Sequence, residues 1–211
     1  MAITTYAELK AAAANWLVRS DLTARIPEFI ALAEARLNRV LRTRLAEADV
    51  ALTCPFGARK VALPAGFTEP LRVWIDDPGG RTELPFLPAE LMGAASLRGR
   101  PGAWSIDGAD LAFDRPCDQD YGVTLRMLKA FALSDAEPSN ALLAAAPDVY
   151  LFAVLAEASP FLRDADLAAA YETKLGRAIE ELNAKDARSR AAGKLTTELP
   201  ALVGGEARAR W

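Results

Sequence analysis

Hydrophobic residues at helical spacing occupy the N-terminal part of the chain. Thr5-x-x-Glu8 forms a capping box in front of YAELKAAAANWLV, which predicts a first helix over 5–18. A second helix is predicted over 26–44, because Pro27 suits a first helical turn and apolar residues recur there at intervals of three and four. Its apolar stripe consists of Ile26, Ile30, Ala33, Leu37 and Leu41, widened by Phe29, Leu32 and Val40.

After residue 45 the pattern changes to short runs that alternate with a period of two. SIDGADLAF at 105–113 predicts a hairpin, because Asp107-Gly108 is a favoured two-residue loop between alternating arms. About six antiparallel strands are expected, near 48–53, 59–63, 71–75, in the two arms of 105–113 and at 121–131. A short helix around 88–97 interrupts them. Six such strands favour a small sandwich or a partly open barrel.

From residue 138 the helical pattern returns. Pro147 is placed to open a helix through DVYLFAVLAEA, and Pro160 is expected to bend or end it. A long helix is predicted from about 164 to 190, with Gly193 as its C-terminal stop. Its apolar stripe consists of Leu167, Tyr171, Leu175, Ala178 and Leu182.

The tetrapeptide LAEA occurs twice, at 32–35 and at 155–158, each time within a predicted amphipathic helix. One reading is packing, in which alanines let helices approach and a glutamate reaches an arginine on a neighbour. The other is a catalytic carboxylate pair made by Glu34 and Glu157. Packing is favoured, because no pocket signature lies nearby. Since each helix would bury only one face alone, the two chain ends are expected to fold together.

These patterns predict an α+β protein: a four-helix bundle built from both chain ends, with an inserted antiparallel β-sandwich or barrel-like domain and an extended C-terminal arm. The first half of the helical domain is expected at 1–45, the β domain at 46–133, the second helical half at 134–192 and the arm at 193–211. The arm is too apolar for a simple solvated linker. A frayed end and self-packing are the alternatives to docking on another subunit, which is favoured. The docking residues would be Leu195, Leu199, Leu202, Val203, Arg208, Arg210 and Trp211.

Composition narrows the possible chemistry. A net charge of −3 and a pI near 5.2 argue against a dedicated nucleic-acid binder. The chain has no histidine, which removes the commonest general base, and it has no nucleotide-binding or hydrolase motif. No cofactor is predicted, and no apolar run is long enough to span a membrane. The N-terminus shows no signal peptide, so synthesis in the cytoplasm is expected.

Two groups of residues could hold a metal or form a bridge. DRPCDQD at 114–120 groups Asp114, Asp118 and Asp120, but without calcium-loop spacing, so a polar strand connection is favoured over a cation site. Cys54 and Cys117 lack C-x-x-C spacing and are read as half-buried thiols at strand ends, with no sign of a disulfide framework or a zinc site.

The helical stretches MAITTYAELKAAAANWLVRSDLTARIPEFIALAEARLNRVLRTR and PDVYLFAVLAEASPFLRDADLAAAYETKLGRAIEELN resemble those of the phage adaptor proteins, also called head-to-tail connector or upper-tail tubular proteins. The resemblance covers roughly residues 1–190. It implies a virion structural protein without enzymatic activity, made in the host cytoplasm and placed in the neck below the portal. It further implies a ring of twelve copies whose C-terminal arm binds the portal protein. Tail or nozzle proteins would bind the opposite side, and genomic DNA would pass through the channel without sequence-specific binding.

Two other functions remain open at this point. A non-viral helical interaction module would share the fold without the virion role. A carboxylate-dependent hydrolase would use Glu34, Glu157 or the aspartates of 114–120, and it requires these acids to converge in one open pocket.

Overall fold

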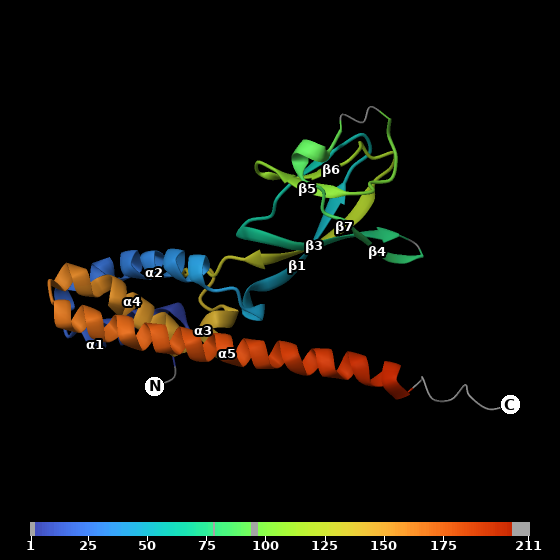
Figure 1. The fold of residues 1–211 in the computed structure, drawn as a ribbon. Helices are drawn as coiled ribbons and strands as arrows, with labels where there is room; N and C mark the ends of the chain where they lie inside the picture. Colours follow the sequence, from blue (N-terminus) through green and yellow to red (C-terminus); the bar gives the residue numbers. More distant parts are fainter. Residues whose placement is uncertain (1–2, 78, 94–96, 204–211) are drawn as a thin grey trace. The chain divides into compact units, whose positions relative to one another are not determined.

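The computed structural model describes residues 3–77, 79–93 and 97–203 of the chain (Figure 1). It is a mixture of helices and antiparallel sheets, which confirms the predicted α+β class. Two compact units divide the chain. Residues up to Leu45 and from Phe131 onward form a helical unit, and residues Ala46–Ala130 form a β unit. Each is described by itself below.

The helical unit brings the two ends of the chain together. Its α-helices are α1 (Tyr6–Leu17), α2 (Ile26–Val40), α3 (Ala141–Ala145), α4 (Pro147–Leu162) and α5 (Ala165–Val203), with short 3-10 turns η1 (Ser20–Arg25) and η2 (Arg44–Ala46). The capping box at α1 is confirmed: the Glu8 N–H donates to Thr5 Oγ1 at 3.3 Å, and the Thr5 N–H donates to Glu8 Oε2 at 3.1 Å. The predicted set of helices lacked α3, whose N-cap is Asn140.

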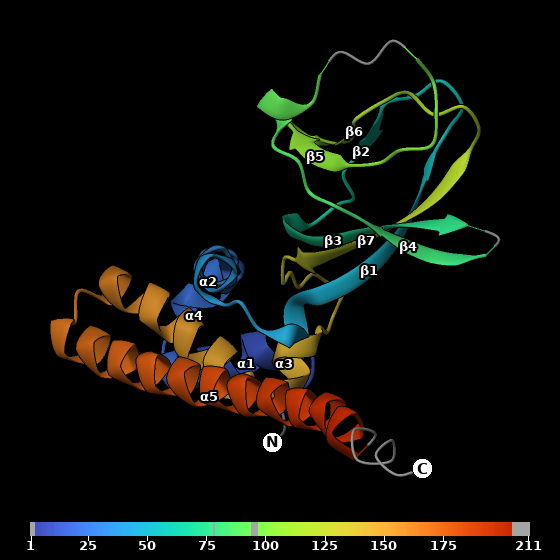
Figure 2. The ribbon, with the colours of Figure 1, turned by 45° about the vertical axis from the view of Figure 1, so that its right-hand side comes forward.

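Helix α4 is the centre of this unit, because each of the other four α-helices contacts it. Figure 2 shows α5 running alongside α4, with α1 and α2 from the other end of the chain nearby. Burial on several sides explains why α4 is more apolar than α1, α2 and α5 and has no clear polar face. Its buried residues are Val149, Tyr150, Leu151, Ala153, Val154, Leu155, Ala156, Ala158 and Ser159.

Other sequence predictions in this unit are also wrong. The arm expected to be extended from 193 is helical up to Val203, where α5 ends. The residues on either side of Gly193, AA and KL, favour a helix, and the roughly 1 kcal/mol cost of Gly193 is too small to end one. The stripe of α2 is also narrower than predicted, since Leu32 and Val40 are half exposed while Ile26, Ile30, Ala33 and Leu37 are buried.

The β unit consists of two antiparallel sheets. The four-stranded sheet has the order β1-β7-β3-β4, and the three-stranded sheet has the order β2-β6-β5. Their strands are β1 (Glu47–Cys54), β2 (Lys60–Ala62), β3 (Phe67–Asp77), β4 (Gly80–Leu84), β5 (Trp104–Asp107), β6 (Asp110–Phe113) and β7 (Tyr121–Lys129). The expected hairpin within 105–113 is confirmed, with Gly108 at φ 65°. Its two-residue loop is Gly108-Ala109 and not Asp107-Gly108 as predicted, because Asp107 is the last residue of β5 and pairs with Asp110 of β6. Strand β4 was not among the six predicted strands. Where a helix was predicted at 88–97, the described residues of that span contain only the 3-10 turn η3 (Ala89–Leu91).

Side chains from both sheets share one core. Val73 and Ile75 of β3 and Val123 and Leu125 of β7 meet Leu111 and Phe113 of β6 there, all fully buried. Cys54 and Cys117 belong to the same core with no exposed surface, so the expectation that these thiols are half buried is wrong.

Candidate functional site

The two LAEA glutamates have different surroundings, and both lie in the helical unit. The Tyr150 hydroxyl donates to Glu34 Oε1 at 3.2 Å and accepts from Asn140 Nδ2 at 2.7 Å. Burial of the Glu34 carboxyl raises its pKa from 4.5 to about 7, although hydrogen bonds from Tyr150 and the Leu133 backbone oppose that rise. Glu34 is therefore part of a hydrogen-bonded contact between α2, α4 and the segment that precedes α3.

Glu157 instead joins an ionic network centred on Arg36 of α2. Arg36 Nη1 lies 3.3 Å from Glu157 Oε1 of α4, and its two Nη atoms each lie 2.6 Å from a carboxylate oxygen of Glu172 of α5. The hydrogen bond from Arg36 lowers the pKa of Glu172. The expectation that an LAEA glutamate reaches an arginine on a neighbouring helix is thus confirmed for Glu157. The bidentate Arg36–Glu172 pair adds α5 to the same contact.

The three aspartates of 114–120 each serve a separate loop contact in the β unit. Asp114 Oδ1 accepts from the N–H groups of Gly102 and Ala103, at 2.8 and 3.3 Å. The carboxylate of Asp118 accepts from the Tyr121 hydroxyl, and that of Asp120 accepts from the Phe56 N–H. Within the described ranges no three Asp, Glu, Cys or His side chains are grouped for a metal ion. This arrangement is that of a polar strand connection.

The pKa of Asp114 reflects two opposing effects. Burial alone would raise it, but the hydrogen bonds from the backbone of Gly102 and Ala103 and from Arg115 together lower it below the ordinary value. Asp114 is therefore held as a charged anchor for the loop that precedes β5.

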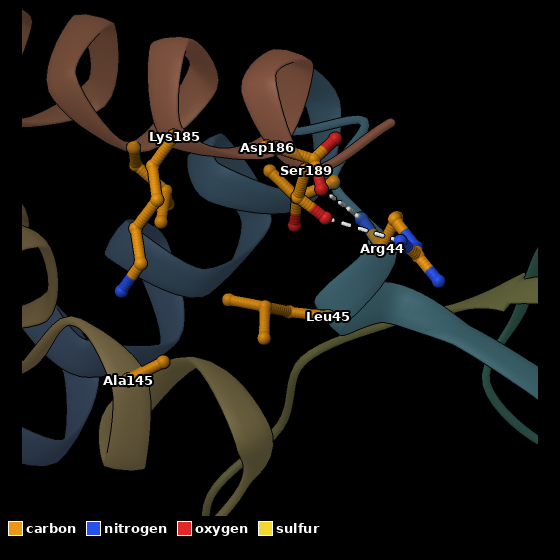
Figure 3. A pocket seen from close by; sticks show the side chains of 8 residues that line it. Arg44, Leu45, Ala145, Lys185, Asp186 and Ser189 are labelled. Carbon is orange, nitrogen blue, oxygen red and sulfur yellow. Dashed lines mark hydrogen bonds between the residues drawn. The ribbon is translucent and has the colours of Figure 1, made fainter. Parts of the chain in front are cut away.

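A pocket of about 330 Å³ lies on the helical unit, between the end of α3, the segment after α2 and the middle of α5 (Figure 3). Its lining consists of Thr43, Arg44, Leu45, Ala145, Leu182, Lys185, Asp186 and Ser189. The Arg44 backbone N–H donates to Asp186 Oδ1 at 3.2 Å, and Arg44 Nη1 donates to Ser189 Oγ at 3.1 Å, as Figure 3 shows.

Polar groups that line this pocket hold α5 to the segment after α2. Asp186 is already bound by Arg190 at 2.8 Å as well as by Arg44, so its charge is compensated. Neither Glu34 nor Glu157 lines the pocket, and the aspartates of 114–120 belong to the other unit. The convergence of acids that a hydrolase requires is therefore not found in it.

An exposed tryptophan marks a further surface of the helical unit that the sequence analysis did not single out. Trp16 of α1 is 45% exposed and packs edge-on against Phe152 of α4, with ring centroids 6.0 Å apart. The Lys174 ammonium of α5 lies 5.5 Å from the Trp16 ring. In the sequence this cluster is marked only by Trp16, near the end of the first predicted helix. The residues that Trp16 contacts, Phe152 and Lys174, lie more than 130 residues away in the sequence.

The comparison with known families decides what kind of protein carries these features. Residues 4–198 match the profile of the family described as SU10 adaptor protein. The chain belongs to this family of phage adaptors. The adaptor resemblance expected from the two helical stretches is thereby confirmed, and membership implies a virion structural protein rather than an enzyme. A search of curated proteins finds no match to the adaptor.

The adaptor's predicted docking residues fall into two groups. Leu195, Leu199, Leu202 and Val203 lie in the helical backbone of α5. Arg208, Arg210 and Trp211 lie outside the described residues, as does all of the predicted arm after Val203. Among the described helices, none combines the length and the apolar composition needed to cross a bilayer.

Proposed function

We propose that the adaptor forms a homo-oligomeric ring of twelve copies that joins the portal of a phage capsid to its tail. The ring lies in the virion neck, with the portal protein on one side and tail or nozzle proteins on the other. The observation that carries this proposal is the family match, which spans both the helical and the β unit. The same match favours the virion role over a non-viral helical interaction module.

The portal contact is assigned to the C-terminal part of α5. This helix has 39 residues and is about 58 Å long, whereas its neighbour α4 has 16 residues and is about 24 Å long. The last buried side chain described on α5 is Leu182, and Figure 1 shows the helix continuing past the other helices of its unit. We assign portal binding to this end of the chain, through Leu195, Leu199, Leu202, Val203, Arg208, Arg210 and Trp211.

The genome passes through the channel of this ring without sequence-specific binding, from packaging and retention to ejection. The net charge of −3 supports this part of the proposal. A basic lining would bind the phosphate backbone of DNA in a salt-dependent way and hinder its passage.

Deletion of residues 194–211 tests the assignment of the portal contact. The truncated chain keeps the described buried positions of α5 and the ion pair between Glu172 and Arg36 of α2, so we expect it to fold but to lose binding to purified portal protein in a pull-down assay. Far-UV circular dichroism and the urea midpoint check the fold. Portal binding by a folded truncated chain would overturn the assignment.

A second variant keeps the test valid if truncation disturbs the helix. Replacing Leu195, Leu199 and Leu202 by serine in the full chain is expected to weaken portal binding at least tenfold, because apolar anchors dominate such interfaces. The matched control replaces Arg177 and Glu181 by alanine, which removes an exposed 3.2 Å pair from the same helix. This control is expected to bind the portal as the natural chain does.

A further inference from the structure

Two cysteines lie side by side in the core of the β unit. Cys54 is the last residue of β1, and Cys117 lies in the connection between β6 and β7, a separation of 63 residues in the sequence. Both are free thiols with no exposed surface. The Cys117 thiol donates to Cys54 Sγ across 2.8 Å.

Backbone hydrogen bonds fix this pairing independently of the sulfur contact. The Gly57 N–H donates to the Cys117 carbonyl at 2.8 Å, and the Cys117 N–H donates to the Ala58 carbonyl at 2.9 Å. These two bonds tie the Cys117 segment to the turn that follows β1. On its other side, Cys54 is paired with Tyr121 in the register of β1 and β7. Both cysteines are therefore held next to each other by the sheet and its turn.

We propose that Cys54 and Cys117 form an intramolecular disulfide when the protein meets a low-molecular-weight disulfide such as oxidised glutathione. One cysteine thiolate attacks the oxidant, which forms a mixed disulfide and releases one small thiol. The second cysteine sulfur then attacks the protein sulfur of that mixed disulfide and releases the second small thiol. Two electrons pass from the cysteine sulfurs to the oxidant, and the two cysteine protons end on the released thiols.

The surroundings of the pair make this a slow structural bridge and not a rapid redox centre. Burial raises the pKa of Cys54, and it raises that of Cys117 to about 12, so few molecules carry the reactive thiolate at neutral pH. The oxidant also has no direct access, since neither thiol is exposed. Oxidation therefore requires local opening of the β unit, after which the backbone bonds favour closure of the internal bridge.

The bridge would stabilise the β unit, because it closes a long loop that contains β2 to β6. Loop-closure entropy for a crosslink of this length predicts an unfolding equilibrium constant on the order of a thousandfold smaller. The stage at which the bridge forms rests on the proposed virion role. The two thiols persist in the reducing cytoplasm during assembly, and they are oxidised after the virion is released from the cell. Bridge formation itself does not depend on ring formation or on the portal.

The test incubates the full chain, without denaturant, in glutathione buffers of increasing oxidising strength. Mass spectrometry counts free thiols, and peptide mapping under non-reducing conditions identifies the linked pair. We expect both thiols to disappear together, with a mass loss of two hydrogen atoms and a Cys54–Cys117 peptide. The Cys54→Ala and Cys117→Ala variants serve as matched controls and are expected to end as free thiols or glutathione adducts.

The urea midpoint of the oxidised natural chain, compared with its reduced form, gives a second readout that needs no variant. It is expected to rise on oxidation. Two free thiols after full equilibration, a bridge between two chains, or a bridge that forms only in denaturant would each overturn the proposal. Portal binding by the reduced chain is measured separately, so failure of the bridge and failure of the proposed function remain distinguishable.

Discussion

Replacing Glu34 by glutamine removes a half-buried carboxyl whose charge the helical unit disfavours. The amide keeps an oxygen that can accept the 3.2 Å hydrogen bond from Tyr150, so the change isolates the charge. In the natural chain the pKa of Glu34 is raised from 4.5 to about 7, which means that the folded state prefers the protonated form. Ionisation of Glu34 therefore destabilises the folded state, and Glu34→Gln removes this cost.

The magnitude comes from proton linkage. Well below pH 4.5 the Glu34 carboxyl is protonated in both the folded and the unfolded chain, so it does not lower the free energy of unfolding. Between pH 4.5 and about 7 the unfolded chain loses this proton first, so the free energy of unfolding falls as pH rises, by up to about 1.4 kcal/mol per pH unit. Above pH 7 the ionised Glu34 carboxylate lowers the free energy of unfolding by the full amount, about 3 kcal/mol. We therefore expect Glu34→Gln to match the natural chain near pH 4.5 and to be up to about 3 kcal/mol more stable near pH 8.

Urea denaturation at a series of pH values, followed by circular dichroism, measures this difference. Subtracting the two curves removes the contributions of the other carboxyl groups, which both chains share. Glu28→Gln is the matched control, because Glu28 is an exposed carboxylate on the same helix, and its effect is expected to stay within about 0.5 kcal/mol at every pH. A Glu34→Gln difference that does not change between pH 4.5 and 8 would refute the reasoning.

Two further predictions concern the helical unit. Val18 ends α1 with φ 50° and is 85% exposed, so Val18→Gly should raise the free energy of unfolding by about 1 kcal/mol in urea denaturation; a decrease would contradict the strain argument. A double-mutant cycle with Arg36→Met and Glu172→Gln should give a coupling of about 1 kcal/mol that shrinks in high salt. A coupling near zero at low salt would show that the bidentate pair does not hold α5 to α2.

Local signals explain which elements were predictable from the sequence. The start of α1 follows from Thr5 and Glu8, and the start of α4 follows from Pro147, because both depend only on residues within one turn. The hairpin within 105–113 is equally local, because Gly108 lies in its two-residue loop. The end of α5 was predicted wrongly, because a single glycine weakens a helix without ending it.

Tertiary context accounts for what the sequence could not show. Leu32 belongs to the apolar stripe of α2 by spacing, yet no local signal tells how much of that stripe its neighbours cover. The partner of Glu34 is Tyr150, 116 residues away, and the partner of Cys54 is Cys117, 63 residues away. Such pairings depend on helix packing and strand register, which become visible only when the chain is folded.

Electron microscopy of the purified adaptor mixed with its portal protein tests the central claim most directly. Two-dimensional class averages are predicted to show a closed ring of adaptor copies, twelve in number, attached to one side of the portal. A homogeneous monomer beside unoccupied portals, at concentrations where the portal itself is intact, would contradict the claim.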